Sequence, residues 1–196
     1  MIYRKLFISI LIFFIASPLL AQHSDSTKAI RRPFALYIGF GPNLYFNNLE
    51  IAKDHVNLLN YSFVGRIMWE PEYFLSLGIE SGYYRLYTVS VSSATEGSAH
   101  IVNNAIPIQV IISMKFLKNY YVNFSMGQTM LLNHSTSSNG ADLHAKTWSF
   151  ADLGAAAGYK FFYKNRFSMG LEAKFFYSTR LDDKNLALVY VAGYRF

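Results

Sequence analysis

Residues 151–178 read ADLGAAAGYKFFYKNRFSMGLEAKFFYS, and within this stretch the character of the side chains changes at every second position. Most odd-numbered positions carry leucine, alanine, methionine, tyrosine or phenylalanine, whereas most even-numbered positions carry glycine, serine or a charged side chain. A period of two is typical of β-strands, because successive side chains of a strand point to opposite faces. Residues 162–166 interrupt the alternation, so the stretch predicts two antiparallel strands joined by a short turn.

The same alternation recurs in six other stretches, which are residues 34–41, 61–69, 73–83, 106–116, 120–130 and 186–196. These strands have about the 9–11 residues that a tilted strand needs to cross a membrane. Short connections (70–72, 117–119 and 162–166) alternate with long ones (42–60, 87–104 and 133–147), and 182–185 is a short exception. Short turns on one side and long loops on the other are typical of outer-membrane barrels. We therefore predict an all-β fold, an eight-stranded antiparallel up-and-down transmembrane β-barrel over residues 34–196.

One of the long connections carries the alternation further. Apolar side chains at 87, 89 and 91 alternate with hydroxyl side chains at 88, 90 and 92. This pattern predicts that the third and fourth strands continue beyond the bilayer as a protruding hairpin over residues 87–103, with its turn near residues 95–97. The exposed edge of such a hairpin can pair with a strand of another chain.

The composition and the N-terminal segment limit the class of protein. The chain has 196 residues, of which 52% are hydrophobic and 15% charged, with a net charge of +6 and no cysteine. These values exclude a disordered chain and a disulfide scaffold. Residues 1–21 combine a basic start, an apolar core and a small residue before Gln22, which predicts a cleaved signal peptide; the alternative is an uncleaved membrane anchor. The polar residues 22–33 predict a periplasmic tail.

Alternation alone leaves open which face of the barrel points inward. A soluble lipocalin-like barrel would turn its apolar face inward. Two observations favour the reverse orientation. Glycines lie on the charged face, and the narrow interior of an eight-stranded barrel needs small residues. The apolar face carries an aromatic residue at the short-turn end of every strand, which predicts a girdle at one membrane interface, made of Phe34, Trp69, Tyr73, Phe116, Tyr120, Phe161, Phe167 and Phe196.

The inward face then carries charged residues that must be paired or hydrated, because an isolated buried charge is unfavourable. We expect one lumenal charge network containing Arg66, Glu80, Lys115, Asp152, Lys160, Glu172, Lys174 and Arg195. The positions of the turns predict Glu172–Arg195 and Asp152–Lys174 contacts within it. This network favours a plugged lumen over the alternative, a small-solute channel. Apolar side chains are expected to crowd the same lumen, namely Val64, Met68, Phe74, Ile111, Phe176 and Val191.

Several stretches resemble a known family: LLAQ (19–22), FALYIGFG (34–41), IPIQVIISMKF (106–116), ADLGAAAGYKF (151–161) and VYVAGYRF (189–196). They are similar to the small outer-membrane β-barrel domain of Bacteroidota, called "porin family" or PorT-like, whose fold is similar to OmpX and OmpA. The resemblance covers residues 34–196 and implies outer-membrane residence, contact with outer-membrane lipids and assembly by the barrel-assembly machinery. Tyr194 and Phe196 resemble the C-terminal signal that this machinery recognises. Since PorT-like members are tied to a secretion system, a surface or secretion-complex protein is the class of partner that the resemblance implies.

Motifs that carry chemistry are missing from the sequence. It has no P-loop, G-x-S-x-G or H-E-x-x-H motif, and we expect no catalytic site, no cofactor and no nucleic-acid partner. His134, Asp142 and His144 share one predicted loop and are residue types that bind metals, but we expect a solvated loop there and no metal site. The favoured function is a structural or interaction barrel. The alternatives are the channel and, second, an outer-leaflet lipid A-modifying enzyme. The deacylase type of such enzymes resembles a His-x-Ser-Asn motif, and residues 134–139 contain histidine, serine and asparagine at a different spacing.

Overall fold

The structure is a computed structural model that describes residues 34–46, 56–71, 74–93, 97–116, 119–137, 142–164, 166–180 and 182–196. All of these residues belong to the second of two units into which the chain divides, Met1–Arg31 and Arg32–Phe196. The predicted signal peptide (1–21) and periplasmic tail (22–33) lie outside the described residues.

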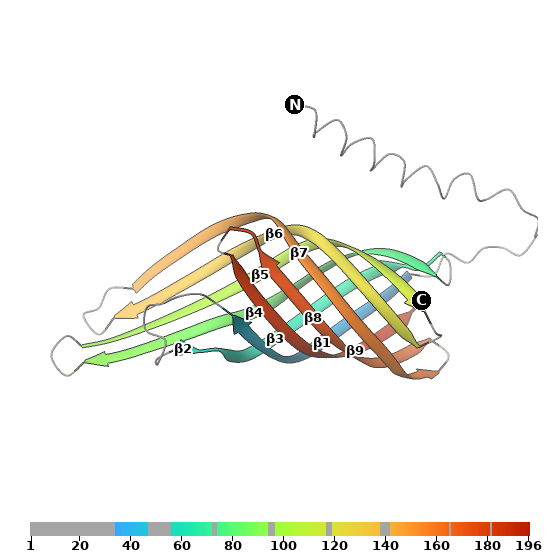
Figure 1. The fold of residues 1–196 in the computed structure, drawn as a ribbon, viewed down its shortest axis with the longest axis horizontal. Coiled ribbons are helices and arrows are strands. Elements are labelled where there is room, and N and C mark those ends of the chain that lie inside the picture. The colour runs from blue at the N-terminus through green and yellow to red at the C-terminus, as the bar shows by residue number, and fades with distance from the viewer. Residues whose placement is uncertain are drawn as a thin grey trace, which may run out of the picture. The chain divides into compact units, whose positions relative to one another are not determined.

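Long antiparallel strands make up this unit, as the alternating sequence predicts (Figure 1). Strand β1 pairs with both β3 and β9, and the pairing of β4 with β5 closes the sheet on itself in the order β1-β3-β4-β5-β6-β7-β8-β9. The predicted eight-stranded antiparallel barrel is therefore confirmed. A ninth strand among the described residues, β2, has two residues and lies beside β4. The bounds are β1 (Phe34–Phe46), β2 (Val56–Asn57), β3 (Leu59–Trp69), β4 (Leu75–Ser93), β5 (Gly97–Phe116), β6 (Tyr120–Ser137), β7 (Asp142–Lys164), β8 (Phe167–Ser178) and β9 (Asp183–Arg195).

Four neighbouring strands, β4 to β7, continue well past the others at the end opposite the short turns (Figure 1). The β4–β5 pairing runs out to Ser93 opposite Gly97, which confirms the predicted hairpin; most of its predicted turn lies outside the described residues. The predicted loop 133–147 is wrong, because β6 continues through Ser137 and β7 begins at Asp142. Polar side chains occupy most positions there, so the sequence shows no apolar stripe by which a strand could be recognised. We call the outer ends of these four strands the β-extension. It consists of residues 88–93 of β4, 97–102 of β5, 133–137 of β6 and 142–145 of β7.

The barrel is apolar outside, and its interior mixes polar and charged side chains with a cluster of buried apolar ones. Exposed and buried side chains alternate along β1 and most of β9, and most of the exposed ones are large and apolar. Soluble monomers rarely expose a contiguous apolar surface of more than a few hundred Å². This belt surrounds the barrel, which indicates a membrane-facing surface. Its exposed members include Leu36, Ile38, Phe40, Phe63, Ile67, Ile79, Ile108, Val110, Phe124, Met126, Leu153, Leu171, Phe175 and Leu188. Within the described residues, no helix is long and apolar enough to span a membrane.

Glycines face the crowded interior, as predicted. A Cβ atom on Gly158 would lie 2.2 Å from the Tyr121 ring, and one on Gly193 would lie 2.3 Å from the Tyr37 ring. Gly65, on the apolar face, would meet nothing within 4 Å. Of the apolar side chains expected in the lumen, five are buried, but the inward prediction for Phe74 is wrong, since that residue precedes β4 and is 62% exposed. Alternation does not extend into a turn, where the backbone is no longer pleated.

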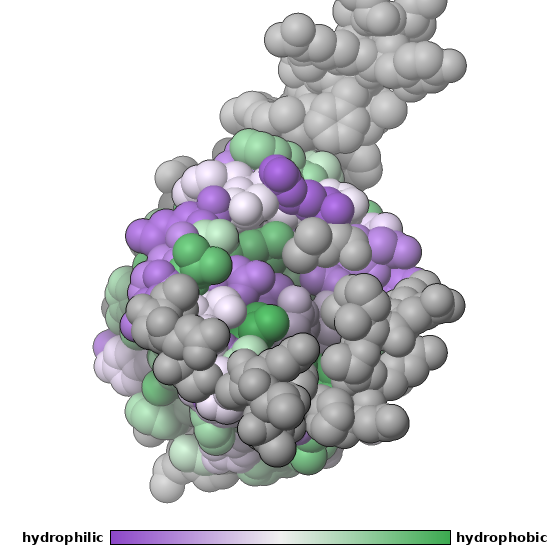
Figure 2. Space-filling model, turned by 90° about the vertical axis from the view of Figure 1, so that its left-hand side faces the viewer, coloured by the Kyte–Doolittle hydropathy of each residue, from purple (hydrophilic) through white to green (hydrophobic). Residues whose placement is uncertain are grey.

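Seen from the end that carries the β-extension, the molecule shows hydrophilic residues gathered around the rim with a few hydrophobic ones between them (Figure 2). This mixture differs from the uniformly apolar belt on the side of the barrel. The end with the short turns carries the C-terminus (Figure 1).

Candidate functional site

A network of buried ion pairs crosses the middle of the lumen. Arg66 of β3 donates two hydrogen bonds to Glu172 of β8, Nη1 to Oε2 at 2.8 Å and Nη2 to Oε1 at 2.6 Å. The same Nη2 lies 2.8 Å from Oε2 of Glu80 on β4, and Glu80 in turn contacts the ammonium of Lys174 on β8. Asn123 of β6 donates to Oε2 of Glu172 at 3.0 Å. All five side chains are buried, so we call them the central network.

The central network crosses the lumen rather than lining one wall of it. In the order of strands around the barrel, β4 and β8 lie diametrically opposite, so the Glu80–Lys174 contact spans the bore. Two carboxylates, one guanidinium and one ammonium balance in charge. Each charge here has a partner of opposite sign, which offsets part of the cost of burying it. The arrangement therefore ties opposite walls of the barrel to each other across the bore.

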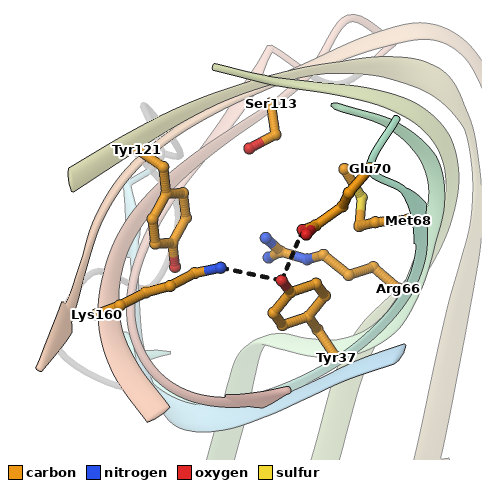
Figure 3. A pocket seen from close by; sticks show the side chains of 7 residues that line it. All are labelled: Tyr37, Arg66, Met68, Glu70, Ser113, Tyr121 and Lys160. Atoms are coloured by element: carbon orange, nitrogen blue, oxygen red, sulfur yellow. Dashed lines mark hydrogen bonds between the residues drawn. The ribbon is translucent and has the colours of Figure 1, made fainter. Parts of the chain in front are cut away.

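A second group of charges gathers around Glu70 at the short-turn end (Figure 3). Glu70 Oε1 accepts a hydrogen bond from the Tyr37 hydroxyl at 2.7 Å, and its Oε2 lies 2.9 Å from Lys115 Nζ and also contacts Arg195. Lys160 Nζ donates to the Tyr37 hydroxyl at 2.9 Å and lies 4.8 Å from the centre of the Tyr37 ring. These five residues, here called the Glu70 cluster, come from β1, β5, β7, β9 and the turn after β3.

The Glu70 cluster is rich in positive charge. Burial alone would raise the pKa of the Glu70 carboxyl, but Lys115 and, more weakly, Lys160 and the Tyr37 hydroxyl outweigh it and hold the pKa at about 2. Glu70 is therefore ionised at neutral pH. A polar cavity of about 20 Å³ lies among Glu70, Tyr37, Lys160, Arg66 and Tyr121 (Figure 3). That volume holds one water molecule and no larger solute.

Asp152 belongs to neither group. Its Oδ1 accepts hydrogen bonds from the Ser149 hydroxyl at 2.6 Å and from the Thr179 backbone N–H at 2.9 Å. A β-bulge in β7 makes this possible: Ala151 has a φ of 62° and no partner on β6, so Ser149 and Asp152 both turn inward. Asp152 thereby ties the β8–β9 turn to β7.

The two predicted contacts, Glu172–Arg195 and Asp152–Lys174, are wrong. Glu172 lies opposite Val189, because the β8–β9 turn is residues 179–182, three positions earlier than the sequence suggests. Asp182 supports this turn with a φ of 54°, a left-handed conformation that aspartate tolerates. The register moves by an even number of residues, so every side chain keeps its face while its partners change. The eight charged residues predicted for one network thus divide among the central network, the Glu70 cluster and Asp152.

Aromatic residues lie at both ends of the apolar belt. At the short-turn end Phe34 stacks on Phe196, Phe116 stacks on Tyr120, and Phe167 meets Tyr194 edge to face. Trp69 lies opposite Phe34, and Tyr73 is outside the described residues. A register shift in β7 follows Lys160, and Phe161 lies beside Tyr190. A second aromatic group, which is not part of the predicted girdle, lies at the other end and contains Phe40, Tyr61 and Tyr83.

Three side chains of the central network and the Glu70 cluster are missing from the predicted lumenal network: Glu70, Tyr37 and Asn123. Glu70 continues the inward period of Arg66 and Met68 by one step, and extending the alternation past Trp69 would have found it. Tyr37 and Asn123 both lie on the inward face by their position in the alternation. Their roles depend on partners from distant strands, which no local pattern identifies.

No protein-family model matches the chain, and no curated protein resembles it in sequence. Solved structures do share its architecture. One is Ail, the attachment invasion locus protein of Yersinia pestis, in complex with the heparin analogue sucrose octasulfate, with a TM-score of 0.55 and 14% identity over 84% of this chain and 99% of that one. The chain has the fold of a small bacterial outer-membrane β-barrel. Neisserial surface protein A matches this outer-membrane barrel with a TM-score of 0.50 and 12% identity, over 83% of this chain and 97% of that one.

The likeness to these outer-membrane barrels explains the inverted polarity described above. A strand in lipid must satisfy its backbone within the sheet, and a closed barrel does so without leaving an edge. Apolar side chains then face the acyl chains, and polar side chains must be accommodated inside. The central network and the Glu70 cluster are how this barrel accommodates them.

Proposed function

We propose that the protein is an exported outer-membrane barrel that does not conduct, and that it works by presenting the β-extension to partners at the cell surface. The observation that carries this proposal is the central network, which joins opposite walls across the bore. A pathway for solutes would have to break these buried ion pairs at every passage. The β-extension, in contrast, offers backbone edges and polar side chains outside the apolar belt.

The proposal also includes how the protein reaches the outer membrane. Residues 1–21 direct export and are cleaved, residues 22–33 remain as a periplasmic tail, and the barrel-assembly machinery recognises the C-terminal signal. Tyr194 and Phe196 are both exposed at the short-turn end, where a chaperone or assembly factor can reach them. The partner class we favour is a protein of an envelope or secretion complex. A non-enzymatic role fits the charged groups of the central network, which are paired with one another.

The closed lumen makes a direct prediction for planar-bilayer recordings. Purified protein inserted into a bilayer is expected to show no unitary conductance steps, because ion pairs fill the lumen and the cavity beside them holds only one water. A large general porin, purified and inserted in the same way, controls for insertion. Reproducible steps from the wild-type protein would contradict the proposal and favour the small-solute channel.

The proposed orientation is testable with single cysteines, because the natural chain has none. Ala145→Cys places a thiol on the β-extension, and the matched variant Asn119→Cys places one at a short turn; both positions are exposed. A membrane-impermeant maleimide should label Ala145→Cys on intact cells and Asn119→Cys only after lysis. A thiol cross-linker should likewise give surface adducts from Ala145→Cys and not from Asn119→Cys. Labelling with the opposite preference would overturn the orientation, and equal adducts from both sites would overturn the role of the β-extension.

A further inference from the structure

Two histidines face each other directly on the β-extension. His134 of β6 and His144 of β7 are register partners, their ring centres are 4.2 Å apart, and their Nδ1 atoms are 2.8 Å apart. The sequence alone places both in a solvated loop. Continuation of β6 and β7 as paired strands instead fixes the two imidazoles side by side at the surface.

The contact between the two rings is one that a metal ion can replace. A hydrogen bond between two Nδ1 atoms needs a proton on one of them and a lone pair on the other. When both rings carry their proton on Nε2, both Nδ1 lone pairs converge on the same small space, and that is the arrangement of a bidentate ligand. Neutral imidazole is the commonest metal ligand that proteins supply.

The spacing of the two nitrogens fits a metal ion whose neighbouring ligands lie at right angles. With metal–nitrogen bonds of about 2.0 Å, two nitrogens at the roughly 90° angle of a square-planar ion lie about 2.8 Å apart, whereas a tetrahedral ion spreads them to roughly 3.3 Å. The observed 2.8 Å matches the square-planar arrangement. Copper(II) prefers that geometry with nitrogen and oxygen ligands, and it also binds such sites more tightly than the other divalent first-row ions.

We propose that His134 and His144 form a copper(II) site on the outer surface of the β-extension. The described residues contain no group of three or more histidine, cysteine, aspartate or glutamate side chains that could hold a metal, so water completes the coordination. Asp142 lies on the same face, two residues before His144 and opposite Thr136. Bound copper would clamp β6 to β7 near the end of their hairpin. This inference goes beyond the proposed function and does not depend on the identity of a protein partner.

Other imidazoles need separate treatment in the test. His100 of β5 lies opposite Thr136, and its Nδ1 is 2.9 Å from the Ser90 hydroxyl, so it serves as a matched control on the same sheet. His23 would be the second residue after the proposed cleavage site, where a terminal amine and an imidazole can together bind copper. The test therefore uses the mature, tag-free protein carrying His23→Ala.

Titration with copper(II) in detergent, followed by electron paramagnetic resonance, tests the proposal. We expect one equivalent bound with splitting from two nitrogens, splitting from a single nitrogen in His134→Ala or His144→Ala, and an affinity lower by at least about tenfold in the double variant. His100→Ala should match the parent. Each variant must still shift its mobility on heating in SDS gels, which shows a folded barrel. An unchanged spectrum in the double variant would overturn the site, and tighter binding of zinc than of copper would overturn its assignment to copper.

Discussion

Replacing Arg66 with methionine is expected to lower the free energy of unfolding by about 3–5 kcal/mol, the range for removing one partner of a buried ion pair. The guanidinium is shared by Glu172 and Glu80, and all three side chains are at most 5% exposed. Without Arg66, two carboxylates remain in the lumen with one ammonium, that of Lys174, close by. Urea unfolding of the protein refolded into lipid vesicles measures the loss.

A double-mutant cycle separates this network from a general loss of packing. Glu172→Gln alone should also destabilise, but the Arg66→Met/Glu172→Gln double variant retains the neutral Glu80–Lys174 pair, so it should cost clearly less than the two single changes added together. The pair Glu172→Gln and Arg195→Gln is the matched control, because Arg195 contacts Glu70 and not Glu172. Additive losses in the first cycle, or strong coupling in the second, would show that the partners in the lumen are assigned incorrectly.

For Glu172 and Arg195, the sequence predicts the face of the strand correctly and the partner incorrectly. Alternation identifies the strands and the face of each residue, because the pleat imposes a period of two whatever the partner strand is. It predicts correctly that Glu172 and Arg195 both point inward. Their partners depend on register, and register depends on where the turn lies. The Thr179–Asp182 turn has no Asn-Gly or Gly-rich signature, so its position was misplaced by three residues.

Contacts across the bore are still harder to predict from the sequence than contacts between neighbouring strands. Arg66 and Glu172 are separated by 106 residues and are not on neighbouring strands, so neither a turn nor a ladder relates them. What determines their contact is the closure of the barrel and the stagger of its strands. The His134–His144 contact is also hard to predict. The pairing of β6 with β7 sets its register, but the polar sequence there does not indicate that the two strands continue so far. Local periodicity thus predicts orientation well and predicts partners poorly.

The second prediction concerns the close packing of the strands around Gly127. Changing Gly127 to alanine is expected to destabilise the protein by roughly 1–3 kcal/mol, the range for overpacking a well-packed interior. A Cβ atom on Gly127 would lie 2.1 Å from the carbonyl oxygen of Ile108 and 2.7 Å from Cα of Gln109. Both are backbone atoms of the paired strand β5, so no side-chain rotation can make room, and β5 and β6 must move apart locally.

Gly65→Ala is the matched control, since the same atom added there meets nothing within 4 Å. The glycine lies on the apolar face of β3, and alanine restricts the unfolded chain more than glycine does, so this change should leave stability unchanged or raise it by about 0.5 kcal/mol. Opposite signs for two identical substitutions in one barrel would be hard to obtain from propensity alone. Vesicle unfolding curves for the two variants, measured side by side, decide the matter: equal losses would mean that the inner wall at β5 and β6 is not crowded and that its inward assignment is incorrect.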